Sequence, residues 1–289
     1  MVISMKKLAV LLCIIIIIFC SCKSESPAEI VTTTLPLYEF TSRLCEGTDL
    51  AVAQLITENV SCLHDYTLKP DQAQSIEKAQ MVIINGAGLE DFMEDALVAA
   101  SYVVNSSEGI ACADSHSQGH GHTHEEDPHI WLSPEHAKHM AQNICTALCS
   151  RYPQYSTIFT QNLDLLITDL NALQVYGESK LSTLSCRKLI TFHDGFSYLA
   201  DSFHLEILHS IEEESGAEAS AAELIGIINL VEDNHLSAIF TEINGSVSAA
   251  NIISKETGVK IYTLDMGMSG KGYFSAMYHN IDTIWEALQ

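Results

Sequence analysis

The sequence predicts an α/β protein with two lobes, each built on a mostly parallel four-stranded sheet with flanking helices, joined by a long linking helix. Two observations predict this fold class. Short runs of β-branched and apolar residues alternate with helical stretches, a rhythm typical of parallel sheets covered by helices. The same rhythm occurs in both halves of the chain, on either side of an uninterrupted helical stretch over residues 153–184. At 289 residues the chain is long enough for one large domain or two of moderate size.

The first half carries four expected strands and the helices between them. The strands are expected at residues 30–35, 50–56, 81–85 and 102–105. Helices are expected from Pro36, from Pro70 to Ala79 and from Leu89 onward, because proline is favoured in the first turn of a helix. Ser133 followed by Pro134 is a favourable start for a further helix, with serine as the N-terminal cap.

The linking helix and the second half follow from the same patterns. Apolar residues recur at helical spacing after the break at Pro153, and Gly177 is the one weak point. A helix of about 28 residues is roughly 40 Å long, which suits a bridge between two lobes. Strands are then expected at residues 189–192, 205–209, 238–241 and 260–264, and helices at 219–234, 246–257 and 273–288. Gly258 stands where a helix is expected to end.

The N-terminus is typical of an export segment. Lys6 and Lys7 precede an apolar run of about twelve residues, which is short for a membrane span and right for a signal sequence. Residues 1–22 resemble a bacterial lipoprotein signal, with Cys22 as the lipidated residue and residues 23–29 as a tether. A lipidated Cys22 would hold the protein on an extracytoplasmic membrane face. An uncleaved N-terminal anchor is the alternative.

The charge and the cysteines narrow the function classes. With 37 acidic and 14 basic residues the net charge is −23, which argues against nucleic acid as a partner. An acidic surface concentrates cations, although the charge can also simply keep the protein soluble. Six of the nine cysteines follow the export segment, and none forms a C-x-x-C pair, so a structural zinc knuckle is not expected.

Five of the 13 histidines fall within residues 114–134. Four of them alternate with Gly, Ser and Thr, a composition suited to weak, adaptable metal capture: His116, His120, His122 and His124. A spacer without a role is the alternative for this tract. The fifth, His129, stands in DPHIWLSP, where Pro128 restrains the backbone and three apolar residues anchor it. His129 is therefore expected to be a ligand with defined geometry.

Four candidate ligands stand where ligands bind in open α/β sheets, beyond the carboxyl ends of strands. They are His64, His129, His193 and Asp265. Any one of them alone would more often be a structural hydrogen-bonding residue, but the set draws two residues from each half. Three imidazoles and one carboxylate suit Zn²⁺ and are poor ligands for Ca²⁺ or Mg²⁺.

Several other acidic residues and histidines near the candidate ligands have possible supporting or surface roles. Glu242, at the end of the strand over 238–241, is a rival to Asp265 as the carboxylate ligand. Asp65 and Asp194 adjoin candidate ligands and could accept hydrogen bonds from them, or be exposed loop acids. His136 and His139 are expected to be surface residues.

These residues carry a family resemblance that spans nearly the whole mature chain. The matching segments are LHDYTLKPDQ, NGAGLEDF, DPHIWLSP, TFHDGFSYLA, AELIGIINLVEDNHLSAIFTE and ETGVKIYTLD. The chain resembles the substrate-binding lipoproteins of bacterial zinc and manganese ABC importers. Leu63 departs from the family, which often has proline just before the first ligand.

The resemblance implies two α/β lobes, a rigid linking helix, and metal bound in the cleft between the lobes. The expected divisions are an N-terminal lobe over 30–152 with a His-rich loop at 114–128, a linking helix over 153–184 and a C-terminal lobe over 185–289. The family ligands carry over onto His64, His129, His193 and Asp265, and histidine at the third position is typical of members assigned to zinc. A membrane permease and its ATPase are the implied partners.

The expected function is therefore a non-enzymatic, monomeric Zn²⁺-capturing component of an ABC importer. A Mn²⁺-specific component and a surface adhesin are the alternatives. A zinc hydrolase is a weaker alternative, because the sequence has no HExxH motif and no separate general base placed by a motif.

Overall fold

The computed structural model describes residues 28–57, 63, 66–112, 127–211, 219–243 and 245–289. The first sheet contains β1 (Ile30–Thr32), β2 (Val52–Gln54), β3 (Met81–Ile84) and β4 (Val103–Asn105). The second contains β5 (Lys188–Thr191), β6 (Glu206–Ser210), β7 (Ala238–Glu242) and β8 (Lys260–Leu264). Each sheet is parallel throughout, in the orders β2-β1-β3-β4 and β6-β5-β7-β8. The predicted fold class is confirmed.

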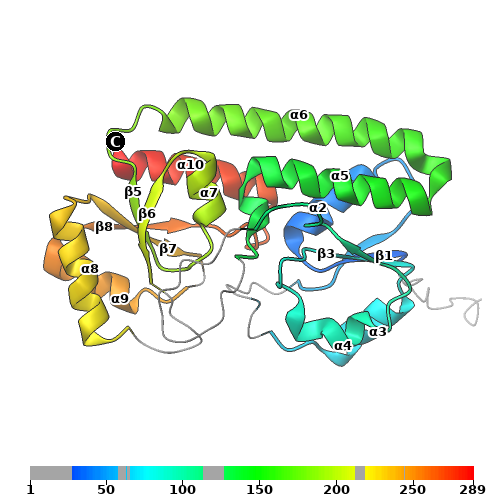
Figure 1. The fold of residues 1–289 in the computed structure, drawn as a ribbon, viewed down its shortest axis with the longest axis horizontal. Coiled ribbons are helices and arrows are strands. Elements are labelled where there is room, and N and C mark those ends of the chain that lie inside the picture. Colours follow the sequence, from blue (N-terminus) through cyan, green and yellow to red (C-terminus); the bar gives the residue numbers. More distant parts are fainter. Residues whose placement is uncertain (1–27, 58–62, 64–65, 113–126, 212–218, 244) are drawn as a thin grey trace, which may run out of the picture.

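The helices cover both faces of the two sheets (Figure 1). One side carries α2 (Leu35–Leu44), α5 (Pro134–Arg151), α6 (Ser156–Leu181) and α10 (Tyr273–Leu288). The opposite side carries α3 (Pro70–Lys78), α4 (Glu94–Leu97), α8 (Ala221–Asp233) and α9 (Ser248–Thr257). The remaining elements are α7 (Ser197–Ser202) and three single 3₁₀ turns, η1 (Asp91–Met93), η2 (Ile130–Leu132) and η3 (Pro153–Tyr155).

The long helix α6 contacts elements from both halves of the chain. It packs against α2 and α5, which precede it, and against α10, which follows it. We call the elements before α6 the N-terminal lobe and the elements after α6 the C-terminal lobe. Leu166, Leu170 and Leu173 on α6 are fully buried within one continuous core that includes residues of both lobes. The periodic leucines therefore do bind the lobes to a common helix.

Direct hydrogen bonds also join the lobes. The Trp131 indole Nε1 donates to the Met266 carbonyl at 2.7 Å, and the Tyr273 hydroxyl donates to the Trp131 carbonyl at 2.9 Å. The Tyr273 backbone N–H, in the first turn of α10, donates to the Glu39 carboxylate on α2 at 2.8 Å. Trp131 and Tyr273 are almost fully buried, so the two bonds between the Trp131 region and the C-terminal lobe are shielded from water, and all three bonds fix the lobes relative to each other.

Local signals account for several helix ends. Ser133 caps α5 with Pro134 in its first turn, and Gly258 ends α9 with a left-handed φ of 77°. The helix expected from Leu89 is much shorter than expected, with only η1 and the four-residue α4 before β4 begins.

His136 and His139 were expected on the surface but are half-buried. The His136 ring packs edge-on against Tyr198 at 5.1 Å between ring centroids, and burial lowers the pKa of His136.

In the parts of the chain that the structure describes, no helix combines the length and the apolar character needed to cross a membrane.

Gly177 is a site of close packing in α6. A Cβ atom at this position would lie 2.3 Å from Cε1 of the buried Phe203 ring. We expect Gly177→Ala to destabilise the protein by about 1–3 kcal/mol through overpacking, which outweighs a gain of about 1 kcal/mol in helix propensity. The measurement is denaturant unfolding. Gly226→Ala on α8 is the matched control, because its Cβ would meet nothing within 4 Å and the variant should be stabilised. A more stable Gly177→Ala protein would contradict this account.

Candidate metal centre

His129 lies between Pro128 and η2 and is almost fully buried, at 4% exposure. Its ring Nδ1 lies 2.8 Å from Oδ1 of Asp127, and its backbone N–H donates to the same oxygen at 3.0 Å. A carboxylate oxygen can only accept here, so Nδ1 carries the proton and Nε2 presents its lone pair. The Trp131 ring packs edge-on against the imidazole at 5.3 Å between centroids. His129 is therefore held in one tautomer and one orientation.

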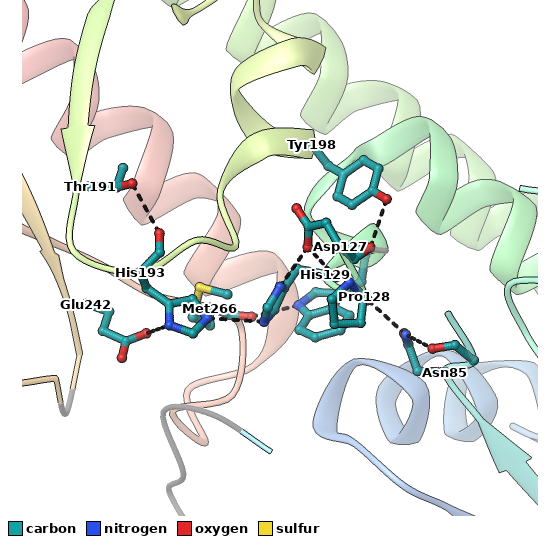
Figure 2. A network of polar contacts seen from close by, with 11 residues as sticks. Asn85, Asp127, Pro128, His129, Thr191, His193, Tyr198, Glu242 and Met266 are labelled. Atoms are coloured by element: carbon teal, nitrogen blue, oxygen red, sulfur yellow. Dashed lines mark hydrogen bonds and ion pairs between the residues drawn. The ribbon is translucent and has the colours of Figure 1, made fainter. Parts of the chain in front are cut away.

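The short segment that carries His129 is held from both lobes (Figure 2). From the N-terminal lobe, the Asn85 side-chain Nδ2 donates to the Pro128 carbonyl at 2.9 Å. From the C-terminal lobe, the Tyr198 hydroxyl donates to the Asp127 carbonyl at 2.8 Å. The donors and acceptors involved are buried, so these bonds position the segment without competition from water.

His193 follows β5 and approaches His129 from the C-terminal lobe. The two ring Nε2 atoms lie 3.3 Å apart, and the rings are nearly perpendicular (Figure 2). Thr191 Oγ1 donates to the His193 carbonyl at 3.1 Å. Because strand order reverses between β5 and β7, His193 stands at the switch point of the second sheet, where open α/β sheets bind ligands.

Glu242 ends β7 on the other side of this switch point. Its Oε2 lies 3.8 Å from Nδ1 of His193. The side chain is 8% exposed, and burial raises the pKa of the Glu242 carboxyl to about 8. A carboxylate this deeply buried has a strong tendency to pair with a cation or a protonated imidazole. Glu242 therefore lies on the Nδ1 side of the His193 ring, whereas Nε2 of that ring faces His129.

Asp265 ends β8 as expected, but its carboxylate bonds within its own loop. Oδ1 accepts from the Gly267 backbone N–H at 2.8 Å, and Oδ2 accepts from the Ser269 hydroxyl. The buried Asn280 side chain on α10 accepts from the Asp265 N–H and donates to its carbonyl, both at 2.7 Å. Within the described ranges, no group of three or more His, Cys, Asp or Glu side chains is gathered for a metal ion.

The structure thus brings together His129 and His193 and places Glu242 next to them. His64, Asp65, the four histidines of the tract at 116–124 and Cys22 lie outside the described residues. Asp194 is buried beside His193. The acceptor of the His129 proton is Asp127, which sequence reasoning did not single out. The signal for it was the spacing of an acid two residues before a histidine, with a proline between them.

The imidazole pair has the spacing of two ligands on one ion. Zn²⁺ holds imidazole nitrogens at about 2.0–2.1 Å in tetrahedral geometry, so two such nitrogens lie roughly 3.3 Å apart. The Nε2 atoms of His129 and His193 are separated by 3.3 Å. Because Nδ1 of His129 donates its proton to Asp127, Nε2 of His129 carries a lone pair, and this atom faces the His193 ring. A proton or a cation between the two Nε2 atoms stabilises this arrangement. A transition-metal ion fits this position chemically.

A second buried carboxyl, Glu90, stands behind this site in the turn after β3. It accepts from the Thr33 hydroxyl at 2.6 Å and from the backbone N–H groups of Asn85 and Gly86 at 2.8 and 2.9 Å. Burial raises the pKa of Glu90 to about 7 from 4.5, although these donors lower it. Because the pKa of Glu90 is higher in the folded state, its protonated form contributes to stability. This contribution is fully present below about pH 4.5 and is lost as the pH rises through about 7.

We therefore expect Glu90→Gln to weaken the pH dependence of unfolding. Between about pH 5 and pH 8 the free energy of unfolding of the wild type should fall by on the order of 3 kcal/mol more than that of the variant, since glutamine cannot titrate. The measurement is the free energy of urea unfolding of the metal-free proteins at both pH values. Glu242 titrates in both proteins, so its contribution cancels. Parallel stability curves for the two proteins would contradict the prediction.

The fold and the site together define a class of protein. Two parallel α/β lobes on a shared linking helix, with imidazoles from opposite lobes facing each other, are the features of a solute-binding protein for a metal ion. The chain belongs to the ZnuA family, zinc-uptake complex component A periplasmic, whose model matches residues 30–287.

Individual relatives support this assignment. A putative metal-binding protein of Treponema pallidum is 28% identical over 290 residues, with 92% of each chain covered. The zinc-binding lipoprotein AdcA of Streptococcus pneumoniae is 29% identical over 305 residues, and the match spans 97% of this chain but 60% of AdcA. A crystal structure of ZnuA superposes with a TM-score of 0.80 at 27% identity, covering 91% of this chain and 100% of that chain.

Proposed function

We propose that this protein is the extracytoplasmic substrate-binding component of an ABC importer, which captures Zn²⁺ between its lobes and delivers it to a membrane permease driven by a separate ATPase. The observation that carries the proposal is the facing pair of imidazoles from opposite lobes, with Nε2 atoms 3.3 Å apart. Membership of the ZnuA family and the zinc-binding name of the pneumococcal relative support zinc as the cargo. The protein itself performs no catalysis in this role.

The proposed ligand set contains residues from both lobes. His129 and His193 supply two nitrogens, and we infer that His64 and Asp265 supply the others, with Glu242 as the alternative carboxylate. Asp265 would exchange its bond from Ser269 for the metal, since a carboxylate oxygen can accept either. A set of three imidazoles and one carboxylate favours Zn²⁺ over Mn²⁺, which prefers more oxygen ligands.

The rest of the chain serves delivery in this proposal. Residues 1–22 direct export, Cys22 carries the lipid anchor, and residues 23–29 form the tether. The lobes comprise residues 30–152 and 185–289, with 153–184 as the linking helix. The histidines at 116, 120, 122 and 124 scavenge zinc weakly for the tight site. The protein acts as a monomer.

Metal analysis of the purified protein tests the proposal. We expect one tightly bound zinc ion per chain after dialysis, and Mn²⁺ in large excess should not displace it. Deletion of residues 115–124 should remove only weakly bound zinc. A chain that retains no zinc, or that exchanges it readily for Mn²⁺, would contradict the proposal. Metal-dependent turnover of esters or peptides would instead favour a hydrolase.

A further inference from the structure

The turn that follows β3 has an unusual and strongly constrained backbone. Gly86, Ala87 and Gly88 have successive φ values of 83°, 53° and 80°, all in the left-handed region. A non-glycine residue there costs about 1–2 kcal/mol, so the turn persists only because its surroundings hold it. A Cβ on Gly86 would lie 2.0 Å from the Asn105 Oδ1 atom, which packs against the turn.

Glu90 supplies most of the constraint. Its carboxylate binds two successive N–H groups of the turn, those of Asn85 and Gly86, and is itself held by the Thr33 hydroxyl. Ser106 fixes the turn from the neighbouring strand, since its hydroxyl donates to the Asn85 carbonyl at 3.0 Å. The backbone of Asn85 is therefore held on both its N–H and its C=O groups.

The side chain of Asn85 leaves this turn toward the metal centre. It is fully buried, and its Nδ2 donates to the Pro128 carbonyl at 2.9 Å and the Gly86 carbonyl at 3.0 Å. Its Oδ1 is buried without a hydrogen-bond partner among the described residues. Leaving a buried acceptor unsatisfied costs about 1–3 kcal/mol. The two donor bonds of Nδ2 are therefore kept at the cost of an unsatisfied acceptor.

The bond to Pro128 acts directly on the ligand. The Pro128 carbonyl belongs to the peptide group that joins Pro128 to His129. Asn85 holds the oxygen of this group, and Asp127 holds its N–H. Because a peptide group is planar, two bonds at its opposite edges fix its orientation and with it the direction of the N–Cα bond that leads into His129. Asp127 then fixes the ring itself.

We propose that Asn85, braced by Glu90, is a positioning residue that sets the geometry of His129 as a zinc ligand. This role rests on the proposed function. The NGAGLE segment is thus a support for the metal centre, although it carries no ligand. Loss of an outer partner of a metal-bound histidine typically lowers metal affinity about 10–100-fold. We expect a loss of about tenfold or more for Asn85→Ala, because the peptide of His129 is then held only at its N–H, by Asp127.

The experiment compares Asn85→Ala with a matched asparagine. Asn162 on α6 also donates Nδ2 to two carbonyls, those of Leu44 and Glu46, both at 2.9 Å, but it joins α6 to the end of α2. Asn162→Ala should therefore lose stability without losing zinc affinity. Zinc affinity is measured by competition with a chelator, and unfolding of the metal-free proteins is measured in parallel. The visible absorption of bound Co²⁺ reports ligand geometry and is insensitive to stability as such.

We expect only Asn85→Ala to show both weaker zinc binding and an altered Co²⁺ spectrum. Asn85→Leu serves as a second variant of similar shape, whose side chain has no donor for Pro128, and it should change both readouts in the same direction. Wild-type affinity and spectrum in either folded Asn85 variant would overturn the positioning role while leaving the proposed function intact. A wild type that binds no zinc would overturn both.

Discussion

Replacing either His129 or His193 by alanine is expected to lower zinc affinity by about 100-fold or more. This exceeds the 10–100-fold typical of outer partners, because a ligand itself is removed. The physical reason is that each imidazole supplies one nitrogen from one lobe, and the 3.3 Å separation of the two Nε2 atoms suits a single shared ion. The measurement is chelator competition with the purified variants.

The control for this pair is His209→Ala. His209 is an exposed histidine on β6, and its loss should leave zinc affinity unchanged. If the two act on the same ion, the double variant at His129 and His193 should lose less binding free energy than the sum of the two single losses, because effects within one site are not additive. A single variant that keeps wild-type affinity would remove that residue from the ligand set.

Substitutions of Asp127 are expected to lower zinc affinity in steps. Asp127→Ala should bind zinc about 10–100-fold more weakly than the wild type, and Asp127→Asn should have an intermediate affinity. Asp127 is 1% exposed, and one of its oxygens receives both the ring Nδ1 and the backbone N–H of His129. Asparagine can still accept these bonds but lacks the negative charge that makes the imidazole a stronger ligand. Alanine removes the acceptor, so the ring can rotate and change tautomer.

Asp282→Ala is the charge-matched control for this series. It removes one acidic residue from the surface, where Asp282 pairs with Lys180 on α6, and it should leave zinc affinity unchanged. The comparison separates local positioning from the general attraction of an acidic protein for cations. Equal affinities for the wild type and Asp127→Ala would contradict the positioning role, as would a greater loss for Asn than for Ala.

Much of the fold could be predicted from local patterns. The expected closing helix at residues 273–288 has the bounds of α10, and Gly258 ends α9 as predicted. The strand expected at 50–56 is shorter in the structure, at Val52–Gln54, because its length is set by pairing with the three residues of β1 and not by the strand propensity of its own residues. The helix expected from Leu89 is likewise reduced, to η1 and the four-residue α4 before β4.

The support of the candidate site could not be predicted in the same way. His129 and His193 stand out because they follow strands in distinctive segments, and their meeting follows from the two-lobed fold. Asn85 and Tyr198 act through bonds to backbone carbonyls 43 and 71 residues away. The first contact lies within the N-terminal lobe and the second crosses between the lobes; both depend on tertiary packing, and no local pattern marks them. Asp127 is an intermediate case, because its bond is local but requires the turn at Pro128.

The most direct test of the account is a crystal structure of the mature chain with zinc, using anomalous scattering to locate the ion. We expect one strong peak between the lobes, about 2.0–2.1 Å from Nε2 of both His129 and His193. A peak bound by only one of these imidazoles, or a strong peak elsewhere with this pair empty, would contradict the claim that the lobes share one metal ion.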